Sequence, residues 1–294
     1  MTTIEQIVGD TRSLLSGSLA PEIGILAQPY SPGDSTVTFA QPRRITDGTT
    51  MCVGLTTLRA LGGETQAPRV VAGTDGSPDV AAPSGTIVHI MPRNTTWQTF
   101  TELVSTVAEL SSPVNGLYSL VTEQFPSDTV DGTYPLSRAP MKVIRVRYLR
   151  PGSTDEWSDV AWDYRPAAGG TPTVHVVSPV PGGTTVEVVT GQTFKTPQAL
   201  DDTLASLDIP DSYRRLLAVG AARNLSLSSE SRRVQPFSQG DPRRAEEVPL
   251  TGSVVVYDRL VRDFKNMVAQ ERTRLISQHS YRAQMERFYA RMGG

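Results

Sequence analysis

The longest helical pattern in the chain runs over residues 253–292, which contain neither Pro nor Gly. Apolar residues recur there at steps of three, four or seven, so they share one face of a helix with 3.6 residues per turn. They are Tyr257, Val261, Phe264, Val268, Leu275, Tyr281, Met285, Phe288 and Met292. A helix over the whole segment would be about 60 Å long at 1.5 Å per residue. We expect its far end to project, so that the apolar face beyond Leu275 packs on another subunit.

The last turns of this predicted helix combine aromatic, Met and Arg side chains. These residue types are enriched in the buried centres of protein interfaces. The candidate docking residues are Tyr281, Arg282, Met285, Arg287, Phe288, Tyr289, Arg291 and Met292. In the first half of the helix, the Arg side chains fit a solvated helix face as well as they fit an interface.

Two stretches of the chain have the short β-prone runs and turn dipeptides of antiparallel strands. The first covers residues 31–94, where Asp47-Gly48 and Asp75-Gly76 are typical turn signals. The second covers residues 126–195, and from Met141 it predicts a four-stranded antiparallel meander. The alternate positions of this meander that are expected to face water are Arg145, Arg147 and Glu187.

Helices are expected around the two β stretches. Thr3 with Gln6, and Thr95 with Gln98, have the spacing of capping boxes, and each pair precedes an apolar stripe. A short helix over about 197–206, another after Pro210 and a polar loop over 226–252 follow. The pattern thus predicts an α+β fold with a helical core and two antiparallel β insertions. The core comprises 1–30, 95–125 and 196–294 with the long helix 253–292, and the insertions are 31–94 and 126–195.

The N-terminal and C-terminal regions of the chain differ in charge. Residues 211–294 hold 15 Lys+Arg and 9 Asp+Glu, a net charge of +6, whereas residues 1–210 hold 13 and 21, a net of -8. This asymmetry fits nucleic acid, an acidic protein surface, or head-to-tail packing of the acidic region of one copy on the basic region of the next. Candidate contacts to a DNA path or to other subunits are Arg232, Arg233, Arg243 and Arg244. Since no DNA-reading motif is present, only phosphate contact without sequence specificity is expected.

The sequence shows no pattern typical of catalysis, cofactor binding or metal binding. His89, His175 and His279 have no second ligand three or four residues away. Cys52 is the only cysteine and lies in an apolar run, which favours a small buried side chain over a nucleophile. Adjacent carboxylates such as Asp201-Asp202 and Asp155-Glu156 are interpreted as caps, turns or solvated charges. We therefore expect no catalytic residue, no metal, no cofactor and no enzymatic activity.

The sequence also bears on the compartment. The first ten residues are polar and acidic, and no apolar run approaches 18 residues, so neither a signal peptide nor a membrane span is expected. Because the chain has a single cysteine, it cannot form an internal disulfide, and it does not require an oxidising compartment. A reducing cytosol is the expected environment.

The order of these segments resembles the head-to-tail adaptor, or connector, proteins of tailed bacteriophages. The segments that carry the resemblance are TTIEQIVGDTRSLL, STVTFAQPRRITDGTTMCVGLTTLRALGG, WQTFTELVSTVAEL, the strands from MKVIRVRYL to TTVEVVT, and IPDSYRRLLAVGAARNLSL. Members of this family form a ring, commonly of twelve copies, beneath the portal protein and around the DNA path. The ring joins the portal to a stopper or tail protein.

The resemblance implies a non-enzymatic structural protein of the virion neck, assembled in the cytoplasm of the host bacterium. It also implies that the long C-terminal helix docks on the portal protein. Other classes stay open from the sequence: another neck or tail-completion protein, a non-specific DNA-binding assembly factor, or an unrecognised enzyme. An adaptor is expected to join portal rings in fixed stoichiometry, whereas a DNA binder is expected to shift duplex DNA with a steep dependence on salt.

Overall fold

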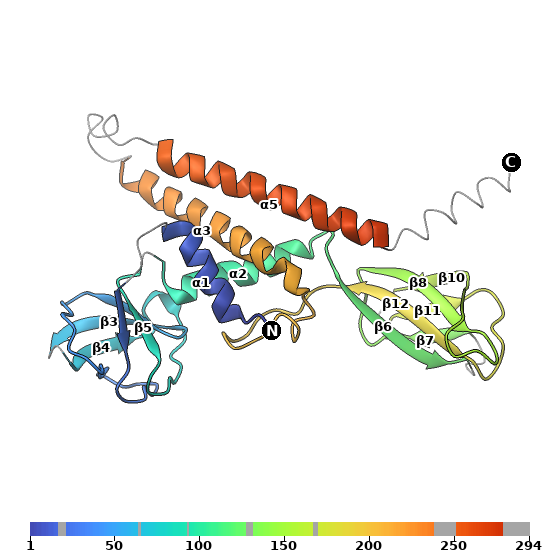
Figure 1. The fold of residues 1–294 in the computed structure, drawn as a ribbon, viewed down its shortest axis with the longest axis horizontal. Helices are drawn as coiled ribbons and strands as arrows, with labels where there is room; N and C mark the ends of the chain where they lie inside the picture. The colour runs from blue at the N-terminus through green and yellow to red at the C-terminus, as the bar shows by residue number, and fades with distance from the viewer. Residues whose placement is uncertain are drawn as a thin grey trace. The chain divides into compact units, whose positions relative to one another are not determined.

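The computed structural model describes residues 1–16, 22–63, 66–92, 94–127, 132–166, 170–237 and 251–278. These residues form four α-helices and twelve strands, and the strands pair antiparallel in three sheets (Figure 1). The chain divides into two compact units. The first comprises Met1–Val107 with Thr196–Met267, and the second comprises Ala108–Lys195 with Val268–Gly294.

The predicted fold class, a helical core with two β insertions, is wrong. The described residues are about as rich in strand as in helix, and strands also occupy regions assigned to the helical core. Strand β1 (Glu22–Ile25) lies in the expected region 1–30, and all but the last residue of β6 (Ser119–Pro126) lies in the expected region 95–125. Side chains of β6 alternate between more and less exposed positions, and the strand pairs along its whole length with β12 (Thr185–Gln192). This long-range pairing decides the structure of the segment, and local periodicity does not reveal it.

The first unit contains a five-stranded sheet in the order β1-β5-β2-β3-β4. Its further strands are β2 (Thr50–Val53), β3 (Thr56–Gly63), β4 (Pro68–Ala72) and β5 (Ile87–Ile90), with the 3-10 turn η1 (Thr74–Gly76) after β4. One face carries a core that includes Phe39, Met51, Leu58 and Val88. Phe39 packs where Gly24 of β1 has no side chain, since a Cβ there would lie 2.6 Å from its ring.

Three of the four described helices begin where the sequence predicts, and the fourth, the long helix, begins two residues before the predicted start at 253. They are α1 (Ile4–Ser16), α2 (Thr96–Leu110), α3 (Arg214–Phe237), which follows the 3-10 turn η2 (Asp211–Tyr213), and α5 (Thr251–Gln278). Both predicted capping boxes are confirmed. The backbone N–H of Thr3 donates to Gln6 Oε1 at 3.2 Å and the N–H of Gln6 donates to Thr3 Oγ1 at 3.4 Å. Thr95 and Gln98 exchange the same two bonds at 3.2 and 3.1 Å.

Two predictions downstream of the strands are wrong. The stretch 197–206 forms turns instead of a helix, and the Asp202 carboxylate accepts the backbone N–H groups of Gln198 at 2.7 Å and Ala199 at 3.0 Å. These bonds hold the backbone in a local turn that competes with a helix. The predicted loop over 226–252 begins as helix, because α3 continues to Phe237. Its first residues contain no Gly or Pro before Pro236, so nothing stops the helix earlier.

Three helices of the first unit meet at Gly220 of α3. A Cβ at this position would lie 2.4 Å from Thr106 Cγ2 of α2 and 2.9 Å from Phe264 Cε2 of α5. The guanidinium of Arg223 lies 4.2 Å from the centroid of the Phe264 ring, and Asn224 Nδ2 donates to Thr106 Oγ1 at 3.4 Å. Helix α3 lies beside α5 in Figure 1. Glycine at residue 220 is what allows this approach.

Gly220→Ala is expected to lower the free energy of unfolding by about 1–3 kcal/mol, because the added methyl group has to displace Thr106 or Phe264. Gly9 of α1 is a matched control, since a Cβ there meets nothing within 4 Å. Gly9→Ala is expected to raise the free energy of unfolding by about 0.5–1 kcal/mol through better helix propensity. Urea denaturation of both variants measures the difference. Effects of the same sign would contradict the close packing at Gly220.

The second unit contains two sheets that share one core. The four-stranded sheet has the order β6-β12-β8-β9, and its further strands are β8 (Lys142–Leu149) and β9 (Trp157–Asp159). The three-stranded sheet has the order β10-β11-β7. Its strands are β7 (Thr133–Pro135), β10 (Trp162–Arg165) and β11 (Thr173–Val176). The core between them includes Tyr134, Val146, Val174 and Val188. The predicted meander is therefore wrong, because β12 pairs with β6 and β8 instead of with β11.

The prediction that Arg147 of β8 and Glu187 of β12 face water is wrong, because both side chains are at least partly buried. Glu187 of β12 is only 5% exposed. Its carboxylate accepts a hydrogen bond from Arg147 Nε of β8 at 2.5 Å and one from Gln124 Nε2 of β6 at 3.3 Å. The Arg147 guanidinium lies 4.7 Å from the centroid of the Trp157 ring. Cross-strand partners therefore bury a carboxylate that alternation alone places in solvent.

Candidate functional site

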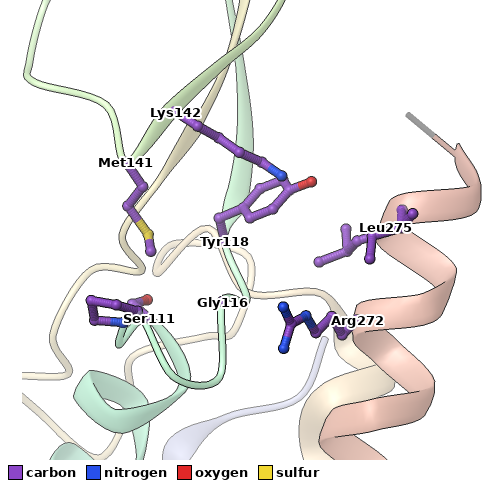
Figure 2. Close-up of a pocket in the computed structure, with 9 residues that line it drawn as sticks. Ser111, Gly116, Tyr118, Met141, Lys142, Arg272 and Leu275 are labelled. Atoms are coloured by element: carbon purple, nitrogen blue, oxygen red, sulfur yellow. The ribbon is translucent and has the colours of Figure 1, made fainter. Parts of the chain in front are cut away.

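A pocket of about 460 Å³ in the second unit combines cationic and apolar side chains (Figure 2). It lies where the loop after α2, the beginnings of β6 and β8, and the end of α5 meet. Its lining consists of Ser111, Pro113, Gly116, Tyr118, Met141, Lys142, Arg272, Leu275 and Ile276. This volume lies in the range of pockets that hold small molecules or side chains of another protein.

Two glycines shape the pocket. Gly116, at a φ of 64°, turns the chain after α2, and its N–H donates to the carbonyl of Ser112 at 2.8 Å. A left-handed backbone of this kind strongly favours glycine. Tyr118 follows this turn, and its ring lies on Gly191 of β12, where a Cβ would be 2.7 Å from Tyr118 Cδ2. The turn and the bare strand position together hold the tyrosine ring against the sheet.

Three side chains of the pocket, Tyr118, Lys142 and Arg272, can donate hydrogen bonds and have no acidic partner among the described residues. Tyr118 is 4% exposed, and its hydroxyl has no hydrogen-bond partner within the portion of the chain that the structure describes. Lys142 Nζ lies 4.2 Å from the centroid of the Tyr118 ring. Arg272 extends from α5 towards the loop at Gly116 (Figure 2). No ion pair involves Lys142 or Arg272 among the described residues, and no carboxylate lines the pocket.

Apolar side chains complete the pocket walls. Leu275 of α5 is buried, whereas the neighbouring Ile276 is 55% exposed at the pocket edge. Pro113 and Met141 contribute further apolar surface. A pocket of this composition suits an anionic group attached to an aliphatic one, because the cations attract the charge and the walls accept the hydrocarbon.

A second polar cluster lies in the first unit and has a structural character. Arg12 Nη2 of α1 donates to Thr96 Oγ1 at 2.8 Å and to the carbonyl of Asn94 at 3.4 Å. Burial raises the pKa of the Cys52 thiol, and burial together with the Arg12 guanidinium lowers the pKa of His89 to about 4. A thiol with a raised pKa is a poor nucleophile, and His89 is neutral near pH 7. The prediction that Cys52 is a small buried side chain is confirmed.

Most of the candidate docking and DNA-contact residues predicted from the sequence lie outside the part of the chain that the structure describes. The candidates that lie outside the described residues are Tyr281, Arg282, Met285, Arg287, Phe288, Tyr289, Arg291, Met292, His279, Arg243 and Arg244. Arg232 and Arg233 belong to α3, but their side chains also lie outside what the structure describes. The predicted docking and DNA contacts therefore stay predictions.

His175, the second described histidine, lies beside a hydroxyl group in the three-stranded sheet. His175 Nδ1 lies 3.3 Å from Thr133 Oγ1 on the neighbouring strand. Among the described residues, no group of three His, Cys, Asp or Glu side chains is placed to hold a metal ion. No described helix is both long and apolar enough to cross a membrane. Sequence reasoning missed the pocket, although a glycine inside a strand pattern, here Gly191, is a recognised sign of close approach.

Comparison of the sequence with protein-family models found no match, and comparison with curated proteins found no match either. The features available are the long helix α5, the exposed apolar side chains on the helices and the cationic pocket.

Proposed function

We propose that the chain is a structural adaptor subunit of a tailed-bacteriophage neck. In this role several copies form a ring beneath the portal protein, and the ring joins the portal to a stopper or other tail-side protein. The ring surrounds passing double-stranded DNA without reading its sequence. The subunit performs no catalysis and belongs to the virion neck.

The observation that carries the proposal is the pattern of helix α5. Its 28 residues correspond to about 42 Å at 1.5 Å per residue. One face buries Leu260, Phe264, Val268 and Leu275. Val255 and Val256 are nevertheless 63% and 45% exposed. Apolar side chains that a long helix leaves in solvent favour contacts with other protein chains.

Two further observations support an assembly role. Leu227 of α3 is 56% exposed, so the neighbouring helix also presents apolar surface. The net charge of +6 over residues 211–294 and of -8 over residues 1–210 fits head-to-tail packing of the acidic region of one copy on the basic region of the next. Both features are what a closed ring of identical subunits uses.

Truncation after Gln278 tests the proposal. Removing residues 279–294 is expected to leave a folded subunit, because all described elements end by Gln278, and to weaken binding to purified portal rings about tenfold or more. Phe288→Ala is expected to cost about 2 kcal/mol of binding free energy or more, as for a buried interface aromatic, whereas Arg291→Ala is expected to cost about 1 kcal/mol or less, as for a rim arginine. The readouts are mass photometry of portal mixtures and circular dichroism of the free subunit.

The unmodified chain sets the reference for this test. It is expected to add to portal rings in a fixed ratio. Repeated weak contacts around a ring can hide the effect of losing a single side chain on binding. Binding should therefore be measured with single subunits as well as with complete rings. Undiminished portal binding by the truncated chain would place the contact elsewhere. Failure of the unmodified chain to join portal rings, with a steep salt-dependent shift of duplex DNA, would instead favour a DNA-binding assembly factor.

A further inference from the structure

We propose that the pocket at Tyr118, Lys142 and Arg272 binds a carboxylate side chain from an acidic segment of a second copy of the chain. The inference rests on the proposed ring and names one contact between neighbouring subunits. It differs from the portal contact, which uses residues 279–294.

The polar groups of the pocket match a carboxylate. A carboxylate only accepts hydrogen bonds, and it offers about four acceptor sites. The buried Tyr118 hydroxyl has no partner among the described residues, although buried polar groups are nearly always hydrogen-bonded. The Lys142 ammonium and the Arg272 guanidinium lie in the same pocket without an ion pair among the described residues. A carboxylate that enters the pocket can accept hydrogen bonds from these cationic side chains and neutralise some of the local positive charge.

The apolar walls favour a protein segment over a DNA phosphate. Phosphate contacts to duplex DNA are made by cations that reach out from a surface to a wide, charged backbone. Here Lys142 and Arg272 lie in a concave pocket whose lining also includes the apolar side chains of Pro113, Met141 and Leu275. A DNA backbone offers nothing that gains from these walls, whereas the aliphatic stem of a Glu side chain, or an aliphatic neighbour of an Asp, does.

Charge identifies the source of the segment as a second copy. No carboxylate of the described chain lines its own pocket, and the excess of acidic residues lies in residues 1–210. In the first unit, Asp47 and Asp75 lie on exposed turns and belong to no ion pair among the described residues. In a ring, such an acidic turn of one subunit can lie against the cationic pocket of the next.

Charge reversal at the pocket tests the inference. Arg272→Glu is expected to weaken self-association of the chain on portal rings about tenfold or more, because it places a carboxylate where the partner's carboxylate binds. Lys265→Glu is the matched control: Lys265 lies on the same helix, is exposed, has no ion pair among the described residues and does not line the pocket. Tyr118→Phe, which keeps the ring on Gly191, is expected to weaken self-association a few-fold by removing only the hydroxyl. Subunits per portal ring are counted by native mass spectrometry as the chain is titrated.

Cross-linking identifies the occupant. A photo-reactive p-benzoylphenylalanine replaces Ile276 at the pocket edge, and isotopically light and heavy copies are mixed before assembly on portal rings. The expected product joins a light and a heavy peptide, and the second peptide contains an acidic residue from the acidic region, residues 1–210. Cross-links only within one copy, or only to the portal, would overturn the inference.

The outcomes separate this inference from the proposed function. If the unmodified chain does not join portal rings, the proposed function fails, whatever the pocket variants do. If it joins them and Arg272→Glu assembles as well as Lys265→Glu, only the pocket inference fails. If Arg272→Glu keeps normal self-association but loses binding to duplex DNA, the pocket takes a phosphate and the inference is overturned.

Discussion

Replacing Phe264 with alanine is expected to lower the free energy of unfolding of the first unit by about 3–5 kcal/mol. Phe264 of α5 is 2% exposed, and its ring contacts the backbone position of Gly220 on α3. The Arg223 guanidinium lies over the same ring, with its carbon 4.2 Å from the ring centroid. The substitution leaves a cavity between helices that Gly220 cannot fill, because it has no side chain. It also removes the aromatic partner of Arg223.

Two other substitutions on α5 separate packing from helix content. Phe264→Leu keeps most of the volume and is expected to cost about 1 kcal/mol. Val255→Ala removes a side chain that is 63% exposed on the same helix and is expected to change the free energy of unfolding by about 0.5 kcal/mol or less. Native-state hydrogen exchange read by mass spectrometry reports each unit separately. Equal effects of Phe264→Ala and Val255→Ala would contradict the packing of α5 on α3.

The features that could be predicted from the sequence depend on short stretches of chain. The starts of α1 and α2 were predicted because each capping box needs only two side chains three residues apart, such as Thr3 and Gln6. Phe264 and Leu275 were predicted to share one apolar helix face, because a continuous helix carries its own period, and both are buried. In these places, local chemistry and the final structure agree.

The fold class could not be predicted, because it depends on which distant strands pair. Strand β12 lies between β6 and β8, so a segment at residues 119–126 becomes a strand through a partner about sixty residues away. The same pairing brings Arg147 and Gln124 onto Glu187 and buries a carboxylate. Period-two alternation indicates which residues share a face, but it does not say what covers that face.

The pocket could not be predicted either, because its lining residues are distant in the sequence. Its three donors, Tyr118, Lys142 and Arg272, come from three separate segments, and none belongs to a recognisable motif. Only the glycines on either side of the tyrosine, at 116 and 191, carry a local signal. Their signal concerns backbone geometry and close approach, and says nothing of charge.

A second large loss of stability is expected when Arg147 is replaced with alanine. The Glu187 side chain is 7% exposed, and Arg147, at 26%, is its cationic partner across β8 and β12. Removing one partner of a buried ion pair leaves an uncompensated charge, which typically costs about 3–5 kcal/mol. Because Arg147 is partly exposed, water can enter the space it leaves, and we expect about 2–4 kcal/mol for this site. The loss of the contact with Trp157 contributes to it.

The cost should depend on which partner is removed. Glu187→Gln leaves a partly exposed arginine that water can solvate, so a loss of about 1 kcal/mol is expected. Changing both residues to methionine removes both charges and keeps apolar volume, and it is expected to cost less than Arg147→Ala alone. Arg150→Ala is the surface control, since Arg150 and Glu156 pair at 59% and 64% exposure, and it should change the free energy of unfolding by about 0.5 kcal/mol or less. Urea denaturation with hydrogen exchange over Ala108–Lys195 provides the measurement. If the double methionine variant is as unstable as Arg147→Ala, the loss comes from packing, and the buried charge of Glu187 is not its cause.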